Sequence, residues 1–408
     1  MENPYIPPRL IHPLAIKVCR MLQEHQYQAF IVGGCVRDLI LKQKPKDWDI
    51  CTDASPQKVM EIFERTIPTG LQHGTVTVCM GEGVENHFEV TTFRIEGEYS
   101  DGRRPDEVFF VMNVEQDLAR RDLTINAIAY DPVTQRITDP YGGVKDLMNG
   151  LIKAVGKPTV RFQEDGLRIM RVARFAARFG YAVDGDTFQG MKDSLDTLRK
   201  VSKERINDEL CKTLMTSDPS FGLQLLQQCG ALEIACPALT SHSLPILNKC
   251  QGELETRLAF LYASVPIPEV QGEMLSLKFS NKQIKKVIFL LDLLGKYNVF
   301  VQKDTALSYK SFMATVKNHA PEAWDQSLEQ FILLTEALGL GSRRQLDKYY
   351  AEVVFSKREM QINGDDILAA GIPAGPRIKK ALEECYLEIL RHPEHNNKYH
   401  LLELVRQF

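Results

Sequence analysis

The sequence predicts an α+β protein, in which a small head with a mixed β-sheet precedes an all-helical extension. Within the first 150 residues, short β-branched and aromatic runs alternate with helix-like segments, and these runs lie at 29–32, 48–51, 74–80 and 88–93. Beyond Lys157-Pro158, apolar residues recur at the helical period of 3.6 up to the C-terminus. The length of 408 residues exceeds what one hydrophobic core usually supports, so several domains are expected.

Breaks in the apolar pattern divide the chain further. Glycine and proline interrupt the helical part near 236–237, 266–272 and 339–341. We therefore expect four domains, namely a head at 1–150, a neck at 151–236, a body at 237–340 and a tail at 341–408.

The composition is that of an ordinary globular protein, with 44% hydrophobic and 25% charged residues. The net charge of −3 excludes a uniformly basic nucleic-acid binder but leaves room for a local basic track. The nine cysteines never show C-x-x-C spacing and mostly lie in apolar segments, which argues against a zinc site or a disulfide scaffold. No apolar run reaches membrane-spanning length, and we expect a cytoplasmic protein with reduced thiols and no membrane partner.

A glycine pair followed by two aspartates is the most informative motif. Gly33 and Gly34 leave the run at 29–32 and open an apolar-periodic segment, so helix-terminal N–H groups there suit an anion such as a triphosphate. Asp47 and Asp49 follow about one helix later and, as residues i and i+2 of a half-buried strand, project from one face. Two such carboxylates can hold divalent cations against phosphate oxygens, so the motif indicates nucleotidyl transfer. The glycine pair alone, or the two aspartates alone, would be common in ordinary turns and would not indicate a function.

Glu89 is a candidate third carboxylate. Alternation along 88–93 puts its side chain on the face opposite its apolar neighbours. If this strand lies beside the one that carries Asp47 and Asp49, the three acids can hold two Mg²⁺ ions, which activate a 3′-hydroxyl and stabilise the leaving pyrophosphate. The alternative is a surface glutamate on an amphipathic strand.

The polar segment at 120–127 has two interpretations. Asp122 is a natural helix cap with Asn126 one turn later, and capping alone accounts for both residues. Alternatively, Asp122 accepts from a ribose 2′-hydroxyl while an arginine such as Arg120 meets the triphosphate.

Arginines gather on the predicted helix at 164–178. At 100° per residue, Arg171, Arg174 and Arg178 share one narrow face with few compensating acids, which implies an anionic partner.

Asp165 and Arg168, at i and i+3 of the same predicted helix, lie close enough to act together. A carboxylate accepts and a guanidinium donates, so the pair fits a base edge with a ring acceptor beside an exocyclic amine. Cytosine and adenine present this edge, whereas uracil and guanine present the reverse. The two residues can therefore select CTP and ATP without a nucleic-acid template, although a surface ion pair is the simpler alternative.

Together these motifs resemble the class II tRNA nucleotidyltransferases, the CCA-adding enzymes of the tRNA nucleotidyltransferase/poly(A) polymerase family. The resemblance follows, in chain order, 33–38, 47–49, 89–94, 120–127, 139–143, 164–168 and 201–210, and more loosely 364–376.

The resemblance implies template-independent addition of CCA to tRNA from CTP and ATP, with Asp47 and Asp49 holding Mg²⁺ and the helical domains holding the tRNA acceptor arm. The residues it implies for nucleotide binding are Gly33, Gly34, Arg37, Arg120, Asp122, Asn126, Asp165, Arg168, Arg171 and Arg174. The residues that look like the flexible loop of the family are Arg94, Asp101, Gly102, Arg103, Arg104 and Pro105. Its presence favours addition of the terminal A.

Three alternatives stay open at this point. An A-adding enzyme that works beside a CC-adding partner would carry the same loop. A bacterial poly(A) polymerase shares the head motifs, but the expected basic C-terminal extension is not evident. A non-catalytic RNA-binding relative would have no need to keep Asp47, Asp49 and Glu89 together.

Overall fold

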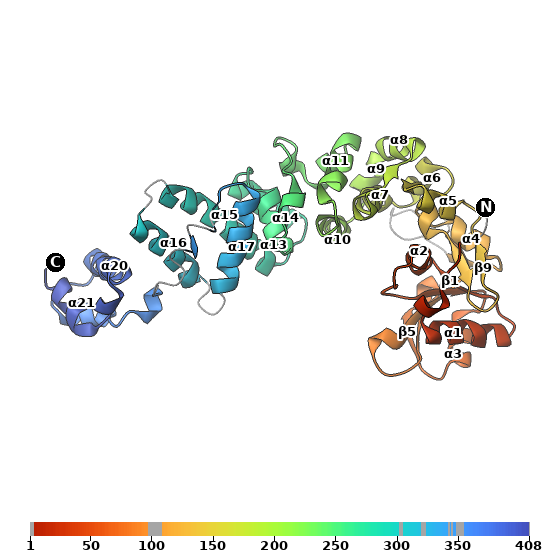
Figure 1. The fold of residues 1–408 in the computed structure, drawn as a ribbon, viewed down its shortest axis with the longest axis horizontal. Helices are drawn as coiled ribbons and strands as arrows, with labels where there is room; N and C mark the ends of the chain where they lie inside the picture. Colours follow the sequence, from red (N-terminus) through yellow and green to blue (C-terminus); the bar gives the residue numbers. More distant parts are fainter. Residues whose placement is uncertain are drawn as a thin grey trace. The chain divides into compact units, whose positions relative to one another are not determined.

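The computed structural model describes residues 4–96, 108–301, 305–319, 324–341, 343, 346–347 and 355–407. The chain divides into two compact units, Met1–Thr240 and Ser241–Phe408 (Figure 1). The first unit holds a β-sheet and its covering helices, whereas the described part of the second unit is helical.

Within the described part of the first unit, seven strands form one sheet in the order β3-β4-β5-β2-β1-β8-β9. The sheet is mixed because β2 and β5 run parallel while the other neighbouring pairs are antiparallel. The strand bounds are β1 Ala29–Val32, β2 Asp49–Thr52, β3 Thr66–Gly70, β4 Thr75–Cys79, β5 His87–Thr92, β8 Ala129–Asp131 and β9 Arg136–Thr138.

The four predicted strands are confirmed as β1, β2, β4 and β5, whereas β3, β8 and β9 were not predicted. β3 and β9 are edge strands with mostly exposed or half-exposed residues, so no apolar alternation marks them. β8 has three residues, all buried, and is too short to show a period. Two small sheets pair β6 Arg94–Glu96 with β7 Val108–Phe110 and β10 Leu151–Ile152 with β11 Ala182–Val183.

The head contains helices between its strands, and the rest of the first unit is mainly helical. Those of the head are α1 Pro13–Glu24, α2 Gly34–Ile40, α3 Pro56–Ile62, α4 Val114–Ala119, the 3₁₀ turn η4 Thr124–Asn126, and α5 Gly143–Met148. Those that complete the first unit are α6 Pro158–Glu164, α7 Leu167–Phe179, α8 Gly185–Asp193, α9 Leu195–Arg199, α10 Lys203–Leu214, α11 Pro219–Cys229 and α12 Leu232–Ala235.

Helix α7 is the centre of this helical part and packs against α10 and α11. Gly222 of α11 allows the close approach, because a Cβ there would lie 2.9 Å from the Cβ of Ala177. The single helix predicted at 164–178 is wrong in one respect, since α6 ends at Glu164 and α7 begins at Leu167. Gly166 lies in this break, and a Cβ on it would come within 2.5 Å of the backbone of Thr197 and Leu198.

The described helices of the second unit are α13 Leu254–Leu261, α14 Ile267–Ser276, α15 Asn281–Val301, α16 Ala306–His319, α17 Trp324–Ala337, α19 Gly364–Ala369, α20 Pro376–Arg391 and α21 Lys398–Val405. The last three enclose a small core of their own, formed by Ile362, Ile367, Ala381, Cys385, Ile389, Leu401 and Val405. None of the helices in the described ranges is long and apolar enough to cross a bilayer.

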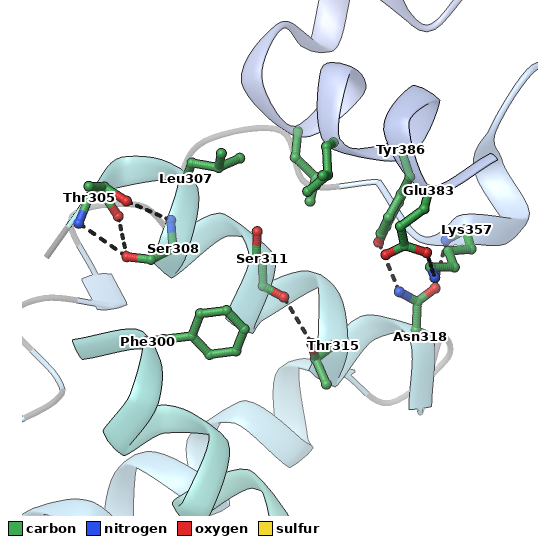
Figure 2. Close-up of a pocket in the computed structure, with 12 residues that line it drawn as sticks. Phe300, Thr305, Leu307, Ser308, Ser311, Thr315, Asn318, Lys357, Glu383 and Tyr386 are labelled. Carbon is green, nitrogen blue, oxygen red and sulfur yellow. Dashed lines mark hydrogen bonds and ion pairs between the residues drawn. The ribbon is translucent and has the colours of Figure 1, made fainter. Parts of the chain in front are cut away.

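A pocket of about 590 Å³ lies within the second unit where α20 meets α16 (Figure 2). Beside it, Asn318 of α16 donates to the Tyr386 hydroxyl over 2.8 Å, and that hydroxyl donates to the Phe355 carbonyl over 2.8 Å. Lys357 pairs with Glu383 across 2.7 Å. These contacts fasten α20 to α16, and the acids predicted for catalysis do not line the pocket.

Candidate active site

Three carboxylates meet at the centre of the sheet. Asp49 opens β2 and its register partner on the parallel neighbour β5 is Glu89, so the two side chains project side by side from the same face. This adjacency meets the condition under which Glu89 can join the two aspartates. Asp47 lies two residues before β2, and the buried Trp48 between the aspartates extends the pairing by accepting from the Glu89 N–H over 3.2 Å.

The electrostatics of this trio favour a bound cation. The pKa of Asp49 is raised to about 6, because burial, with Glu89 and Asp47 adding to it, outweighs the opposing charge of Arg121. Asp47 and Glu89 are exposed and line a pocket of about 290 Å³ together with Lys46, Thr69, Thr77 and His87. Three clustered carboxylates fit a divalent metal ion, whose charge would offset the repulsion that Glu89 and Asp47 exert on Asp49.

Gly33 and Gly34 occupy the start of α2, as the sequence predicts. Gly33 precedes the helix with φ of 78°, and a Cβ on it would lie 2.8 Å from Nη1 of Arg121, so glycine is required there for two reasons. The Gly33 N–H donates to the Ile128 carbonyl over 3.0 Å and thus extends the pairing of β1 with β8. The anion-binding role predicted for the pair therefore depends on the N–H groups from Gly34 onward.

Arg121 is a site residue that the sequence reasoning did not select. Its Nη2 lies 3.1 Å from the buried Asp117, its Nη1 faces Gly33, and its charge lowers the pKa of Asp49. Its Nε is buried without a hydrogen-bond partner. The adjacent Arg120 was chosen instead, but its side chain is held by Asp117 over 2.9 Å. The pattern Arg-Arg-Asp alone gives no signal as to which arginine faces the acids.

Arg37, Asn126 and Asp122 form a buried chain of hydrogen bonds below the site. Arg37 donates to Asn126 over 2.6 Å, Asn126 donates to Asp122 over 3.1 Å, and Arg171 of α7 donates to Asp122 over 2.7 Å. Burial alone would raise the pKa of Asp122, but Arg171 and Asn126 outweigh it and hold the pKa well below its usual range. Four residues predicted for nucleotide binding are thus brought together, and the chain joins the head to α7.

The arginines of α7 are compensated by acids from elsewhere in the chain, so the expectation of few compensating acids is wrong. Arg174 donates to the buried Glu209 of α10 over 2.5 Å, and Arg178 lies 3.6 Å from Asp38 of α2. Arg171 meets Asp122 and lies 3.6 Å from Glu209. These acids stand up to 140 positions before or 38 positions after their arginines, so the pattern of the helix alone cannot reveal them.

Asp165 and Arg168 have different partners in the structure. Asp165 has an extended backbone in the break between α6 and α7, so the helical i, i+3 geometry expected for the pair is wrong. Its carboxylate accepts from both terminal nitrogens of Arg205, over 3.1 and 2.7 Å. Arg168 donates to Glu164 over 2.5 Å and to the carbonyl of Arg120 over 2.9 Å. Sequence reasoning assigned no role to Arg205, because 40 residues separate it from Asp165.

The remaining predicted segments are placed in part. Arg94 lies on β6 opposite Phe110 of β7 and donates to the His73 carbonyl. Asp139 accepts from the backbone N–H of Gly143 over 2.7 Å, which closes the turn before α5. The other residues predicted for the flexible loop lie outside the described ranges, namely Asp101, Gly102, Arg103, Arg104 and Pro105.

A mixed sheet that presents three carboxylates beside a glycine-opened helix defines the head of a nucleotidyltransferase. Three family profiles match the chain in order: "Poly A polymerase head domain" at 29–153, "RNA and SrmB-binding site of polymerase A" at 180–242, and "tRNA nucleotidyltransferase domain 2" at 251–405. A CCA-adding enzyme of Lactobacillus johnsonii is 34% identical over 406 residues, covering 96% of both chains. One of Limosilactobacillus reuteri is 35% identical over 412 residues, covering 98% of this chain and 97% of the relative. The chain belongs to the CCA-adding enzymes, the tRNA nucleotidyltransferase family.

Solved structures agree with this assignment. The crystal structure of the Bacillus stearothermophilus CCA-adding enzyme in complex with CTP matches with a TM-score of 0.77 and 29% identity, covering 97% of this chain and 98% of that one. The Thermotoga maritima CCA-adding enzyme complexed with tRNA matches with a TM-score of 0.66 over 97% of this chain and 96% of that one, and at 18% identity it supports the fold alone. Enzymes of the nucleotidyltransferase superfamily use divalent metal ions.

Proposed function

We propose that the protein adds the 3′-terminal CCA to tRNA from CTP and ATP, without a nucleic-acid template and with release of pyrophosphate. The observation that carries the proposal is the pairing of Asp49 with Glu89 in register, with Asp47 beside them. The curated relatives named as CCA-adding enzymes and the CTP complex of the Bacillus stearothermophilus enzyme support it. As a tRNA-processing enzyme, the protein is proposed to act in the cytoplasm.

Asp47 and Asp49 are the proposed metal ligands, with Glu89 as the third acid beside them. The ions, proposed to be Mg²⁺, supply activation of the tRNA 3′-hydroxyl and charge stabilisation of the leaving pyrophosphate. The new bond joins the 3′-oxygen to the α-phosphorus, and the bond to the β-phosphate breaks. Arg121 adds positive charge next to Asp49 and opposes the rise in the pKa of that carboxyl.

Asp165 and Arg168 are the proposed readers of the incoming base. A carboxylate offers about four acceptor positions, so Arg205 can orient Asp165 while one position stays open to an exocyclic amine. Arg168 donates to the ring acceptor of cytosine or adenine once it exchanges Glu164 for the base. The buried chain through Asp122 and Asn126 supports the ribose and triphosphate from below.

The second unit is the proposed site for the tRNA acceptor arm. Support comes from the match of residues 251–405 to "tRNA nucleotidyltransferase domain 2" and from the Thermotoga maritima relative, whose structure holds tRNA. Phosphate contacts spread over this unit would supply affinity that does not depend on the catalytic acids.

The decisive experiment offers purified protein three tRNA substrates, one without CCA, one ending in C and one ending in CC. With CTP and ATP together, each should be extended to CCA and no further, as read from product length. Extension of the CC-ending substrate alone would assign the protein to the A-adding enzymes, and long poly(A) products would assign it to the poly(A) polymerases. The double variant Asp47→Asn/Asp49→Asn is the inactive control.

A further inference from the structure

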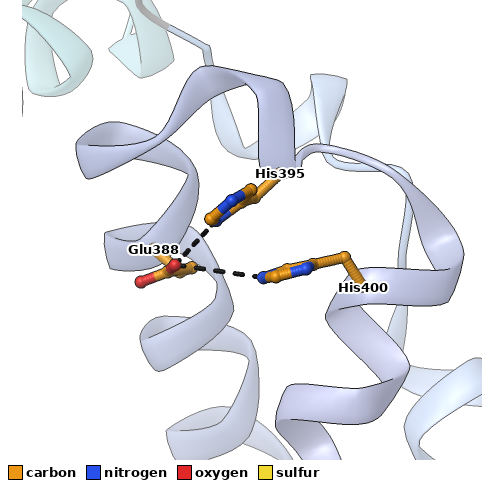
Figure 3. Close-up of side chains that lie close together, drawn as sticks. All are labelled: Glu388, His395 and His400. Atoms are coloured by element: carbon orange, nitrogen blue, oxygen red, sulfur yellow. Dashed lines mark hydrogen bonds and ion pairs between the residues drawn. The ribbon is translucent and has the colours of Figure 1, made fainter.

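Three metal-binding side chains converge at the C-terminal end of the second unit. Glu388 of α20, His395 at the end of the 3₁₀ turn η8 (Pro393–His395) and His400 of α21 place their ligand atoms within 4.8 Å of one another. Glu388 Oε1 lies 2.8 Å from His395 Nδ1 and 4.0 Å from His400 Nε2. The carboxylate faces both imidazole rings (Figure 3).

These separations fit the donor atoms around a small transition-metal ion. Bonds of about 2.0–2.2 Å in a tetrahedral array place neighbouring donors roughly 3.4 Å apart. The separations of 2.8 and 4.0 Å bracket that value, and side-chain rotations that unstack the rings of His395 and His400 would bring both imidazole nitrogens to it. Two imidazoles with one carboxylate suit Zn²⁺ and other late first-row ions, whereas Mg²⁺ and Ca²⁺ prefer oxygen ligands alone.

The backbone that carries these ligands is held by its own packing. Ile389 and Leu401, the chain neighbours of Glu388 and His400, are fully buried in the core shared by α19, α20 and α21. Asn397 caps α21 by accepting from the His400 N–H over 2.9 Å. A site built on fixed elements loses little conformational entropy when an ion binds.

The side chains themselves are ordered but open to solvent. The rings of His395 and His400 stack with centroids 3.9 Å apart. Arg391 lies 3.9 Å from Oε2 of Glu388, which leaves Oε1 facing the imidazoles. The three side chains are between 20% and 39% exposed, so an ion can enter from solvent.

We propose that Glu388, His395 and His400 bind one late first-row transition-metal ion, represented by Zn²⁺, with water as the fourth ligand. The ion joins the end of α20 to the start of α21. This site runs against the expectation drawn from cysteine spacing, because its donors are imidazoles and a carboxylate rather than thiolates. Its donors also differ in kind from the oxygen-only acids of the head.

The test is calorimetric titration of chelator-treated, full-length protein with ZnSO₄ in excess MgCl₂, which occupies oxygen-only sites. One Zn²⁺ per chain should bind to the wild type. His395→Ala, His400→Ala and Glu388→Gln should each weaken binding at least about tenfold. His242→Ala is the matched control, since His242 is half-buried in the same unit but lies outside the cluster, and it should bind as the wild type does. Co²⁺ absorption gives an independent readout of imidazole ligation.

Four outcomes would overturn the proposal. The first is an absence of stoichiometric binding, and the second is undiminished binding by His395→Ala and His400→Ala. The third is that His392→Ala abolishes Zn²⁺ binding while His400→Ala retains it, which would assign the ion to the neighbouring group of His392, Glu394 and His395. The fourth is loss in Asp47→Asn/Asp49→Asn, which would assign it to the head. Circular dichroism checks that each variant folds, and if a histidine variant does not, Glu388→Gln decides.

Discussion

Two acidic clusters in the first unit differ in how their charge is balanced. Asp49 and Glu89 stand on neighbouring strands with Asp47 just before β2, and burial, helped by repulsion from Glu89 and Asp47, raises the pKa of Asp49 to about 6. Asp122 and Glu209 are more deeply buried, yet arginines of α7 take up their charge, and the pKa of Asp122 stays well below its usual range. Burial raises the pKa of both Asp49 and Asp122, and the nearby charges and hydrogen bonds decide the direction of the net shift.

The difference teaches where chemistry is to be sought in this fold. A cluster whose charges are satisfied within the chain holds two parts together, here the head and α7. A cluster with surplus negative charge is destabilising by itself and gains by receiving a cation. The predictions below test this contrast, in order of decreasing expected effect.

Asp49→Asn should lower kcat for nucleotide addition by at least about 10³-fold, because a proposed ligand of the catalytic metal ions is lost. The free energy of unfolding should stay equal or rise, since repulsion with Asp47 and Glu89 is relieved. Single-turnover kinetics and urea unfolding measure the two effects, and tRNA binding is followed by filter binding. Substantial turnover in excess Mg²⁺ would refute the metal role.

Glu209→Ala, in contrast to Asp49→Asn, should lower the free energy of unfolding by about 3–5 kcal/mol. The substitution leaves Arg174 without the carboxylate of a buried pair. Urea unfolding gives the magnitude. The matched control is Glu204→Ala on the exposed side of the same helix, expected to stay within about 0.5 kcal/mol of the wild type. Equal effects of the two substitutions would show that the buried cluster is not a structural link.

Asp165→Ala should cost about 1–3 kcal/mol in kcat/KM for both CTP and ATP, since both lose the same acceptor. Discrimination against UTP and GTP should narrow, because their carbonyl oxygens no longer face a carboxylate. Kinetics with all four nucleotides decide the matter, with Asp196→Ala at an exposed acid of α9 as control. If the ratio of kcat/KM for CTP to that for UTP is unchanged, Asp165 is only a structural partner of Arg205.

The smallest expected effect is a pH dependence of stability. The folded-state pKa of Asp49, about 6, exceeds the unfolded value of about 3.9, so the folded protein binds this proton more tightly. Without metal, the contribution of Asp49 to the free energy of unfolding should increase by about 1–2 kcal/mol as pH falls from about 7 to 4. The difference between wild type and Asp49→Asn isolates it from other carboxylates. Saturating Mg²⁺ should suppress the pH dependence of this difference in the free energy of unfolding. If the difference does not change with pH in the absence of metal, the prediction is wrong.

What the sequence predicted well depends on short-range pattern. Alternation located the strands that carry Asp49 and Glu89, and the glycine pair located the start of α2, because side-chain direction and helix termini follow from neighbours in the chain. The parallel pairing of β2 with β5, which sets Asp49 beside Glu89, could not be predicted from the sequence, since no local pattern fixes which strands become neighbours.

What the sequence missed depends on partners far along the chain. Arg205 and Glu209 owe their places to contacts with Asp165 and Arg174, which periodicity on one helix cannot reveal. Arg121 faces Gly33, which lies far earlier in the chain, although its ion-pair partner Asp117 is only four positions away. For the same reason, the prediction that the arginines of α7 have few compensating acids is wrong. The roles of the individual nucleotide-binding residues stay predictions.

The break between α6 and α7 has a consequence for genetics. Gly166 has no side chain and takes no part in chemistry, yet any larger residue there would press on the backbone of Thr197 and Leu198 and displace the adjoining Asp165. In a random-mutagenesis screen for loss of tRNA repair, we therefore expect position 166 to be as intolerant of substitution as the acids of the sheet. A screen scored by activity alone would mistake this spacer for a member of the catalytic apparatus.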